Sequence, residues 1–395
     1  MSVKKIRDYL TTKEDWYIMV VRGGDIMLCK FKVNGYKGFE NEIELNLENH
    51  NDYQFNKNLI KTNIINKAIV YGNNASGKTS LGYALFDIVF HLTDKNRNME
   101  SNIQRNYLNM NSKKKYAEFY YEFKFDNDRI IYKYRKENLY KIIYEELIYN
   151  GKKIIEYDFN NPKDKIVDLE EAKTLNWQYN DDDLSIVKYI CNNTIFDKNT
   201  ALPKFMEFVN SMLWFRSGDN IGFIGLRNNS NVLDKIIIDN KKTKDFSGFL
   251  KENGINYNLV ELESVNDKIL GVKIGNRLTT FESIISTGTK ALWLYYCWEI
   301  YFEKVKFLFI DEFDATYHFD LAARIVMRLN SKTNFQSILT SHNTYLMSNK
   351  LTRPDCAFII TPNVIKNLPN CTDKELREAH NIEKLYREGL FTDNK

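Results

Sequence analysis

The chain has 395 residues, of which 43% are hydrophobic and 27% charged, a globular composition that suits one large domain with an insertion or two domains. The net charge of only +4 excludes a global attraction to nucleic acid, although a local basic face stays open. No apolar run approaches the ~20 residues of a membrane span and the N-terminus lacks a signal-peptide core, so we expect a cytoplasmic protein without a membrane segment.

The cysteines are scattered along the chain and form no Cys-x-x-Cys pair. This pattern predicts reduced thiols and gives no support to a zinc site or a disulfide framework. The five residues are Cys29, Cys191, Cys297, Cys356 and Cys371.

The first third of the chain reads as strands around one helix. Residues 1–25 are expected to form a short polar extension. Residues 26–47 alternate apolar and polar positions around a Gly-rich break, which predicts a strand, a turn and a second strand. A buried strand at 68–71, a loop and a helix to about Leu92 follow.

A strict period of two at 116–125 predicts a strand of an antiparallel sheet, with one apolar face and one charged face. Residues 129–136 and 141–159 continue that sheet, with Asn150-Gly151 as a hairpin turn. The apolar face holds Ala117, Phe119, Tyr121, Phe123 and Phe125, and the other holds Glu118, Glu122 and Lys124.

Residues 160–258 are more polar and are expected to be mainly helical. Within them, 203–215 begins with Pro203 and places apolar residues as far as Met212 at helical spacing, which predicts one amphipathic helix. Strands return at 259–263 and 268–275. An apolar helix near 287–298 precedes a buried strand at 306–312, a helix, a strand at 336–341 and a helical tail at 374–391.

Residues 72–79, Gly-Asn-Asn-Ala-Ser-Gly-Lys-Thr, match the phosphate-loop pattern G-x-x-x-x-G-K-[ST] between a strand and a helix. In such a loop the backbone N–H groups surround the phosphates, Lys78 reaches the β- and γ-phosphates, and the Thr79 hydroxyl binds Mg²⁺. The predicted nucleotide-binding residues are Gly72, Asn73, Asn74, Ala75, Ser76, Gly77, Lys78, Thr79 and Ser80.

Two later strands end in residues that suit the same site. Asp311 would hold Mg²⁺ directly or through water, and Glu312 would polarise the attacking water as a general base. His342 would sense or bind the γ-phosphate. Each has an ordinary alternative, since acids at a strand end also cap helices and a lone histidine there is usually structural, but the phosphate loop favours the catalytic interpretation.

The turn Ser-Thr-Gly-Thr-Lys at 286–290 opens the apolar helix, where free backbone N–H groups and the positive end of the helix dipole suit an anion. Ser286, Gly288 and Thr289 are therefore candidate phosphate contacts. The alternative is an ordinary helix cap by Ser286 or Thr289.

Together these segments resemble ABC-type ATPase heads related to RecF, SMC and OLD proteins. More narrowly they resemble the AAA_15 and RloA-like ATPases of bacterial phage-defence operons, of the AbiL or PARIS type. The resemblance does not cover 160–258, and it is carried by residues 31–47, 64–81, 286–290, 309–318, 339–343 and 380–391. It implies that the 286–290 turn contacts the γ-phosphate held by a second protomer.

The sequence departs from these relatives at three points. Ala75 stands where RecF-like loops usually have Gly, and His318 where many ABC heads have Asp. The glutamine of the usual Q-loop is not evident, with Gln104 as the candidate.

The resemblance implies an α/β fold of the P-loop NTPase class, ABC-ATPase head type, with an antiparallel side sheet and a mainly helical insertion. We expect an N-terminal ATPase lobe at 1–158, the insertion at 159–258, and a C-terminal ATPase lobe at 259–395 with the signature turn, the acidic strand and His342.

The lengths exclude some relatives. SMC heads need hundreds of coiled-coil residues between loop and signature, whereas only about 200 lie here. OLD nucleases add a Toprim domain, whereas only 53 residues (395 − 342) follow His342. We therefore expect a compact ATPase head without its own nuclease.

The leading hypothesis is an ATP- and Mg²⁺-dependent sensor and scaffold of an anti-phage system. It would form a head-to-tail dimer or higher oligomer and control a separately encoded effector, Toprim-like or another nuclease. The alternatives are a RecF-like repair ATPase acting on DNA and an ATP-binding structural subunit with little turnover. Residues 132–141 with Lys113–Lys115 would touch nucleic acid or form a solvated sheet face.

Overall fold

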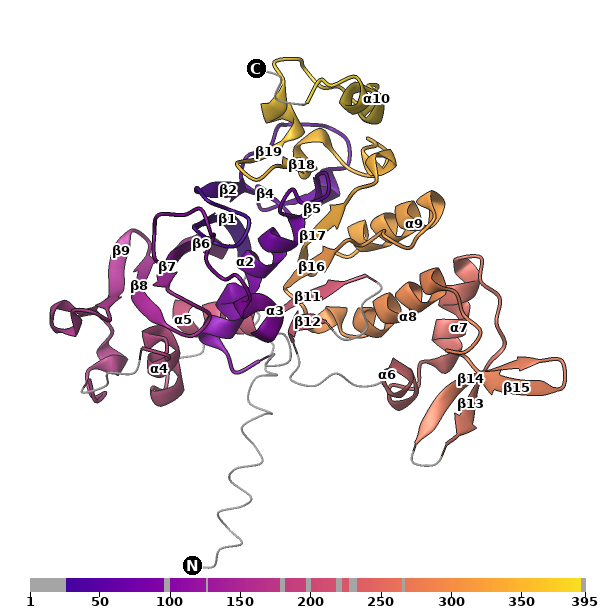
Figure 1. Ribbon diagram of the computed structural model, residues 1–395, viewed down its shortest axis with the longest axis horizontal. Helices are drawn as coiled ribbons and strands as arrows, with labels where there is room; N and C mark the ends of the chain where they lie inside the picture. Colours follow the sequence, from indigo (N-terminus) through magenta and orange to yellow (C-terminus); the bar gives the residue numbers. More distant parts are fainter. Residues whose placement is uncertain are drawn as a thin grey trace, which may run out of the picture.

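The computed structural model describes residues 26–95, 100–125, 127–177, 182–196, 200–217, 222–226, 233–264 and 267–391. A central parallel sheet lies between an antiparallel side sheet and a smaller α/β part (Figure 1). The predicted fold class, α/β with a phosphate loop and an antiparallel side sheet, is confirmed. The extension predicted at 1–25 lies outside the described residues.

The central sheet has the order β12-β11-β16-β17-β5-β18-β19. Strands β11, β16, β17, β5 and β18 run parallel, and β12 and β19 are antiparallel edges. Its strands are β5 (Lys67–Tyr71), β11 (Met212–Arg216), β12 (Phe223–Gly225), β16 (Phe307–Asp311), β17 (Gln336–Ser341), β18 (Ala357–Ile360) and β19 (Ile365–Asn367). All residues of β5, β16 and β17 are buried, as expected of strands covered on both faces.

The side sheet has the order β10-β9-β8-β7-β6-β1-β2, and every pair is antiparallel. It consists of β1 (Ile26–Asn34), β2 (Ile43–Asn46), β6 (Ala117–Phe125), β7 (Asp128–Lys136), β8 (Ile142–Tyr149), β9 (Lys152–Asp158) and β10 (Ile166–Val167). The predicted apolar face of β6 is buried, and the β8–β9 hairpin turns at Asn150-Gly151.

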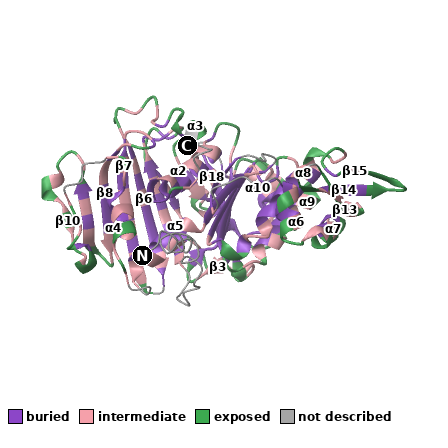
Figure 2. Ribbon diagram, turned by 90° about the horizontal axis from the view of Figure 1, so that it is seen from below, coloured by how far each residue is buried: buried purple, intermediate pink, exposed green. Residues whose placement is uncertain are grey.

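Helix α2 (Lys78–Leu92) follows the phosphate loop and is enclosed by the two sheets (Figures 1 and 2). Its apolar residues join one core with the side sheet and one face of the central sheet. The Tyr121 hydroxyl of β6 donates a hydrogen bond to the Ala84 carbonyl of the helix at 2.8 Å. The helix that begins the site is therefore fixed from both sides.

A buried ion pair also joins α2 to the side sheet. The Lys136 ammonium lies 3.0 Å from Asp87 Oδ1, and both side chains are at most 1% exposed. Asp87 also accepts hydrogen bonds from the hydroxyls of Tyr107 at 2.9 Å and Tyr134 at 3.1 Å. Burial lowers the pKa of Lys136, and the Asp87 charge opposes that shift.

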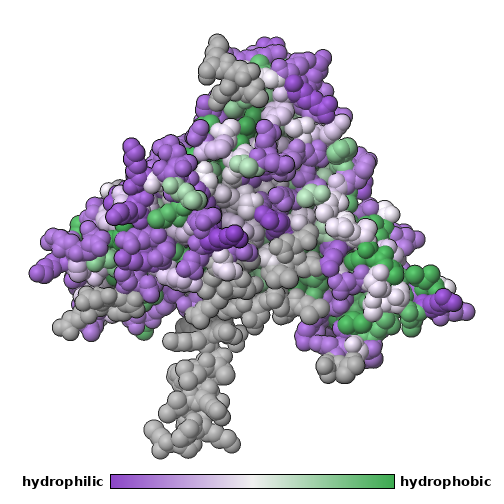
Figure 3. Space-filling view, in the orientation of Figure 1, coloured by the Kyte–Doolittle hydropathy of each residue, from purple (hydrophilic) through white to green (hydrophobic). Residues whose placement is uncertain are grey.

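Helices α8 (Thr287–Glu299) and α9 (Phe319–Asn330) share a second core with residues of the opposite face of the central sheet. The same core holds α6 (Leu233–Asp239), α7 (Thr243–Glu252) and part of a sheet of β13 (Leu259–Glu263), β14 (Lys268–Ile274) and β15 (Arg277–Thr280). At the tip of this sheet Ile274 and Leu278 are 56% and 59% exposed, at the end of the molecule where Figure 3 shows apolar surface.

The short elements are α3 (Glu100–Gln104), α4 (Ile186–Asn193), α5 (Ala201–Asn210), α10 (Ile382–Arg387), β3 (Ile60–Lys61) and β4 (Ile64–Ile65). None of the helices in the described part of the chain is long and apolar enough to cross a membrane.

Two predicted helices are wrong in extent. The helix predicted over 203–215 ends at Asn210, and Met212 begins β11, because the backbone from Met212 onward pairs in parallel with β16. The tail predicted to be helical over 374–391 is helical only at Ile382–Arg387. Since β11 lies within 159–258, that segment supplies a strand of the ATPase sheet.

The buried Asp87–Lys136 pair predicts that removing one charge destabilises the protein more than removing both. Asp87→Asn leaves the buried Lys136 ammonium without its counter-ion and should cost about 3–5 kcal/mol of unfolding free energy in chemical denaturation. Adding Lys136→Met should recover part of this loss, since Asn keeps an oxygen for the tyrosine hydroxyls and Met replaces the charge.

Glu118→Gln is the matched control on the same sheet, where Glu118 and Arg135 form a half-exposed pair at 2.9 Å. It should cost about 1 kcal/mol or less. Equal losses for Asp87→Asn and Glu118→Gln would contradict a structural role for the buried pair.

Candidate nucleotide-binding site

The phosphate loop joins β5 to α2 in a conformation that needs small residues. A Cβ on Gly72 would lie 2.4 Å from Ser76 Oγ, and one on Gly77 would lie 2.8 Å from the Phe39 ring. Gly77 has φ 101° and Ala75 φ 62°, both in the left-handed region that favours glycine. The departure at Ala75 therefore places a side chain on a strained backbone position.

Lys78 points back into the loop. Its ammonium donates hydrogen bonds to the carbonyl oxygens of Gly72 at 2.7 Å and Asn73 at 2.8 Å, and lies 3.3 Å from His342 Nδ1. Burial lowers the pKa of Lys78, and the charges of Asp311 and Glu312 oppose that shift. The fold thus brings together Lys78 and His342, which are 264 positions apart.

Asp311 ends β16 with a fully buried side chain. Its Oδ2 accepts a hydrogen bond from the Thr79 hydroxyl at 2.8 Å, and its Oδ1 accepts one from Thr340 of β17 at 2.8 Å. A carboxylate beside a threonine hydroxyl is an all-oxygen donor set, which Mg²⁺ prefers. Ser76 Oγ is also buried, with no hydrogen-bond partner among the described residues. These residues fit Mg²⁺ and a phosphate.

Glu312 stands where the sheet edge meets solvent. Its φ is 49°, an uncommon value for a residue with a side chain, and its N–H donates to Thr340 Oγ1 at 2.8 Å. Its side chain is 37% exposed. Strained backbone of this kind clusters at functional sites. The turn thus directs one acid, Asp311, inward and leaves the next accessible to a water molecule.

Arg216 is a site residue that the sequence analysis missed. From the end of β11 its Nη2 donates to Asp311 Oδ2 at 2.8 Å and to Thr79 Oγ1 at 3.0 Å, and its Nε lies 3.1 Å from Asp311 Oδ2. A sequence signal for this residue was present. Two apolar runs end in a charged residue in the same way, Met-Leu-Trp-Phe-Arg and Phe-Leu-Phe-Ile-Asp. The helical spacing predicted through Met212 concealed the strand.

Two residues noted in the sequence lie elsewhere. Gln104 is exposed at the end of α3. His318 precedes α9 with a side chain 76% exposed, 3.8 Å from Asp320. Neither contributes a hydrogen bond to Asp311 in the described residues. Arg216, not Gln104, reaches the site from the strand beside β16.

The 286–290 turn is a partly exposed helix start, in which Ser286 and Thr287 are exposed and the predicted phosphate contact Thr289 is buried. Ser286 Oγ accepts a hydrogen bond from the Thr289 N–H at 3.2 Å and lies 3.0 Å from Thr289 Oγ1. A Cβ on Gly288 would lie 2.9 Å from the Thr316 carbonyl, in the loop that follows Glu312. The helix cap that the sequence left as an alternative is present. The described hydrogen bonds of Ser286 and Thr289 stay near the turn and do not reach the phosphate loop.

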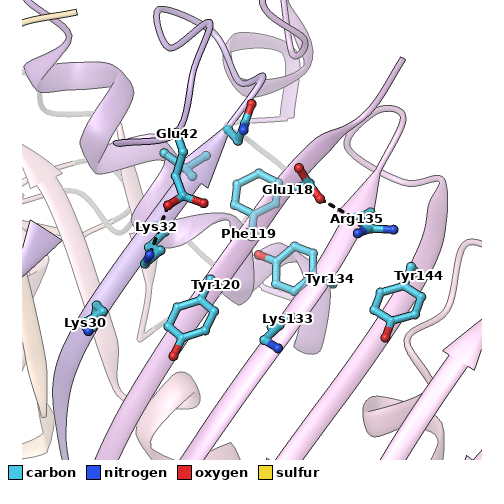
Figure 4. Close-up of a pocket in the computed structure, with 12 residues that line it drawn as sticks. Lys30, Lys32, Glu42, Glu118, Phe119, Tyr120, Lys133, Tyr134, Arg135 and Tyr144 are labelled. Atoms are coloured by element: carbon cyan, nitrogen blue, oxygen red, sulfur yellow. Dashed lines mark hydrogen bonds and ion pairs between the residues drawn. The ribbon is translucent and has the colours of Figure 1, made fainter. Parts of the chain in front are cut away.

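The basic and aromatic residues of 132–141 divide between the two faces of the side sheet. Tyr132, Tyr134 and Lys136 are buried on the face toward α2. On the outer face, Lys133 and Arg135 line a cavity of about 300 Å³ with Lys30, Lys32, Tyr120 and Tyr144 (Figure 4). Three of its cations are paired: Lys32 with Glu42 at 3.1 Å, Arg135 with Glu118 at 2.9 Å and Lys133 with Glu146 at 2.7 Å. This pairing favours the solvated sheet face over a nucleic-acid contact.

Comparison with known proteins identifies a family. The AAA_21 family, described as "AAA domain, putative AbiEii toxin, Type IV TA system", matches residues 67–348, from β5 through His342. Among proteins with curated descriptions, none matches the sequence.

Several solved structures are loosely similar. The SMC head domain from Thermotoga maritima is 14% identical, covering 86% of this chain and 98% of its own, with a TM-score of 0.41. The SMC head bound to the C-terminal winged-helix domain of ScpA is 16% identical, with coverages of 86% and 96% and a TM-score of 0.43. RecF-ATPrS, from the RecFOR pathway, is 14% identical, with coverages of 88% and 99% and a TM-score of 0.41.

The geometry of the site predicts that ATP binding and ATP hydrolysis are lost in different variants. Lys78→Ala should abolish most ATP binding, because the triphosphate loses its main cationic contact. Glu312→Gln should keep binding and lose turnover, because an amide of similar shape cannot accept the proton of the attacking water. Equilibrium nucleotide binding and phosphate release measure the two effects. Near-wild-type hydrolysis by Glu312→Gln would remove Glu312 from the catalytic role.

Proposed function

The chain belongs to the AAA-domain family whose description names a putative AbiEii toxin and a type IV toxin–antitoxin system, and from this premise we propose an ATP-hydrolysing sensor and scaffold subunit of a bacterial anti-phage defence system. It would act in the cytoplasm and control a separately encoded effector. The single observation that carries ATP chemistry is the convergence of Lys78, Thr79, Asp311 and His342 at one edge of a parallel sheet.

The proposed reaction is ATP hydrolysis, and each residue has a place in it. Loop N–H groups and the Lys78 ammonium bind the phosphates, which replace the loop carbonyls that now hold Lys78. Thr79 and Asp311 would hold Mg²⁺, which would neutralise charge on the phosphates. Glu312 accepts a proton from the attacking water, and His342, already beside Lys78, contacts the γ-phosphate.

We propose that the site is completed by the 286–290 turn of a second protomer. Ser286 and Thr287 are exposed, and α8 is a 13-residue helix whose N-terminus offers N–H groups and a positive dipole end. A γ-phosphate would then be held between two heads in a head-to-tail dimer, so ATP would join the protomers and ADP would release them. A larger ring or filament uses the same contact.

The defence role rests on the family description and on the resemblance of the sequence motifs to AAA_15 and RloA-like ATPases. In the described part of the chain, no group of three or more His, Cys, Asp or Glu side chains is placed to hold a metal ion. We propose that any nuclease chemistry belongs to the effector, Toprim-like or another nuclease. The paired cations of the side sheet give the RecF-like alternative, direct action on DNA, no specific support.

The two-protomer site predicts complementation between inactive proteins. Ser286→Arg should block closure, and Lys78→Ala should block nucleotide binding. A mixed pair contains one site with both defects and one site with neither, so phosphate release should reappear on mixing, up to about a quarter of the wild-type rate if pairing is random and each site acts alone. Absence of any recovery, with a fully active Ser286→Arg protein, would make the turn a helix cap only.

Ser286→Ala separates the two roles of this serine. Loss of the cap alone costs about 1 kcal/mol of stability and adds no bulk at the interface. Ser286→Ala should therefore hydrolyse ATP much faster than Ser286→Arg at a temperature where both are folded. Gly288 is a poorer choice, because any side chain there meets the Thr316 carbonyl.

The separate effector predicts that the purified chain leaves nucleic acid intact. Incubation of the chain alone with DNA or RNA, ATP and Mg²⁺ should give no cleavage, and cleavage should require a co-purified partner. Cleavage by the chain alone that a substitution within the chain abolishes would contradict the proposal.

A further inference from the structure

We infer that Arg216 and Mg²⁺ compete for the same oxygens of Asp311 and Thr79, and that Arg216 moves to the γ-phosphate when Mg²⁺ and ATP bind, as a phosphate-sensing arginine supplied by the same protomer. This inference rests on the proposed ATP binding. It adds a residue that reads whether the bound nucleotide carries a γ-phosphate.

Arg216 contacts two side-chain oxygens of the candidate site. Its Nη2 lies 2.8 Å from Asp311 Oδ2 and 3.0 Å from Thr79 Oγ1. These two oxygens are the proposed protein ligands of Mg²⁺, and they lie only 2.8 Å apart. A metal ion at its normal distance of about 2.1 Å from them needs the space that the guanidinium fills. Arginine and Mg²⁺ therefore exclude each other at these oxygens.

The Asp311 carboxylate needs a positively charged partner. The Asp311 side chain is fully buried, and a buried carboxylate needs a counter-charge when no metal is bound. Arg216 supplies it, since its Nη2 forms an ion pair with Asp311 Oδ2 at 2.8 Å. When Mg²⁺ takes over the neutralisation of Asp311, this reason for the arginine to stay disappears.

Only the side chain of Arg216 needs to move. The backbone of β11 is held in parallel register with β16, with Arg216 opposite Asp311. Trp214 of the same strand is buried against α2, where a Cβ on Gly82 would lie 2.6 Å from its ring nitrogen. The Arg216 side chain, in contrast, is 31% exposed and therefore has open space on one side.

The guanidinium of Arg216 lies close to Glu312. Nε of Arg216 lies 3.9 Å from Glu312 Oε2, so the guanidinium stands between the Mg²⁺ ligands and the proposed general base. Its Nη1 makes no hydrogen bond within the described residues and is available to a phosphate oxygen. A guanidinium binds phosphate bidentately, which an ammonium does not reproduce. A short rotation therefore exchanges a carboxylate for the γ-phosphate beside Glu312.

Arg216→Gln tests both halves of this inference without turnover. We expect Mg²⁺ alone to raise the thermal midpoint of Arg216→Gln by several degrees and that of the wild type by much less, because no cation competes for Asp311 and Thr79. In titrations with a fluorescent ADP, half-maximal binding should need several-fold less Mg²⁺. The preference for ATPγS over ADP should fall about tenfold, the loss of one charge-assisted contact.

Two further variants make the result specific. Arg216→Lys keeps the charge without the bidentate geometry, so it should preserve folding and still lose most of the ATPγS preference. Arg135→Gln removes an arginine from the outer face of the side sheet and should leave both measurements at the wild-type values. Circular dichroism of all variants in EDTA establishes that each is folded.

The outcomes distinguish this inference from the proposed function. Wild-type protein that binds nucleotide, with an Arg216→Gln variant of unchanged Mg²⁺ response and unchanged ATPγS preference, overturns the inference and leaves ATP binding intact. A changed Mg²⁺ response with an unchanged preference overturns the sensing role. Wild-type protein that binds no nucleotide overturns the proposed function and the inference together.

Discussion

A carboxylate that is removed from water must be paired, and the buried Asp311 side chain imposes this requirement on the whole site. Its partners come from separate parts of the chain: Thr79 lies in the first turn of the helix after the phosphate loop, Thr340 is the last residue but one of β17, and Arg216 ends β11. Because each partner must be within hydrogen-bond distance, the order and register of the central strands are tied to this one side chain. An unpaired charge here would cost several kcal/mol.

The side sheet fixes α2, and α2 in turn fixes the phosphate loop. A phosphate loop binds phosphate with backbone N–H groups, so the position of the helix that follows it must be fixed. Helix α2 is enclosed by two sheets, and the buried Asp87–Lys136 pair joins it to β7. The outer face of the side sheet, with its paired cations, is then the solvent side of a structural element. The side sheet thus stabilises α2, whereas the phosphate-binding residues lie at one edge of the central sheet.

Polar groups in this site combine structural and chemical roles. Ser286 caps α8 and also stands at the exposed helix end proposed to meet a second nucleotide. Thr340 supports Asp311 with its hydroxyl and holds the backbone of Glu312 in an unfavourable conformation. Arg216 neutralises a buried acid and also occupies the space of a metal. For such residues, the structural role and the chemical role are not alternatives, because one side chain has both.

The sequence by itself determined the local elements and much of the site. The phosphate loop, the period-2 strand at 117–125 and the apolar strands that end in Asp311 and at Ser341 before His342 were predictable, because spacing and periodicity are local properties. The sequence did not determine which strand lies beside β16. Apolar residues from Phe205 to Met212 satisfy helical spacing, and only pairing with β16 decides that the helix ends at Asn210 and that Arg216 reaches Asp311. Strand pairing is a tertiary contact between residues far apart in sequence, and no local pattern encodes it.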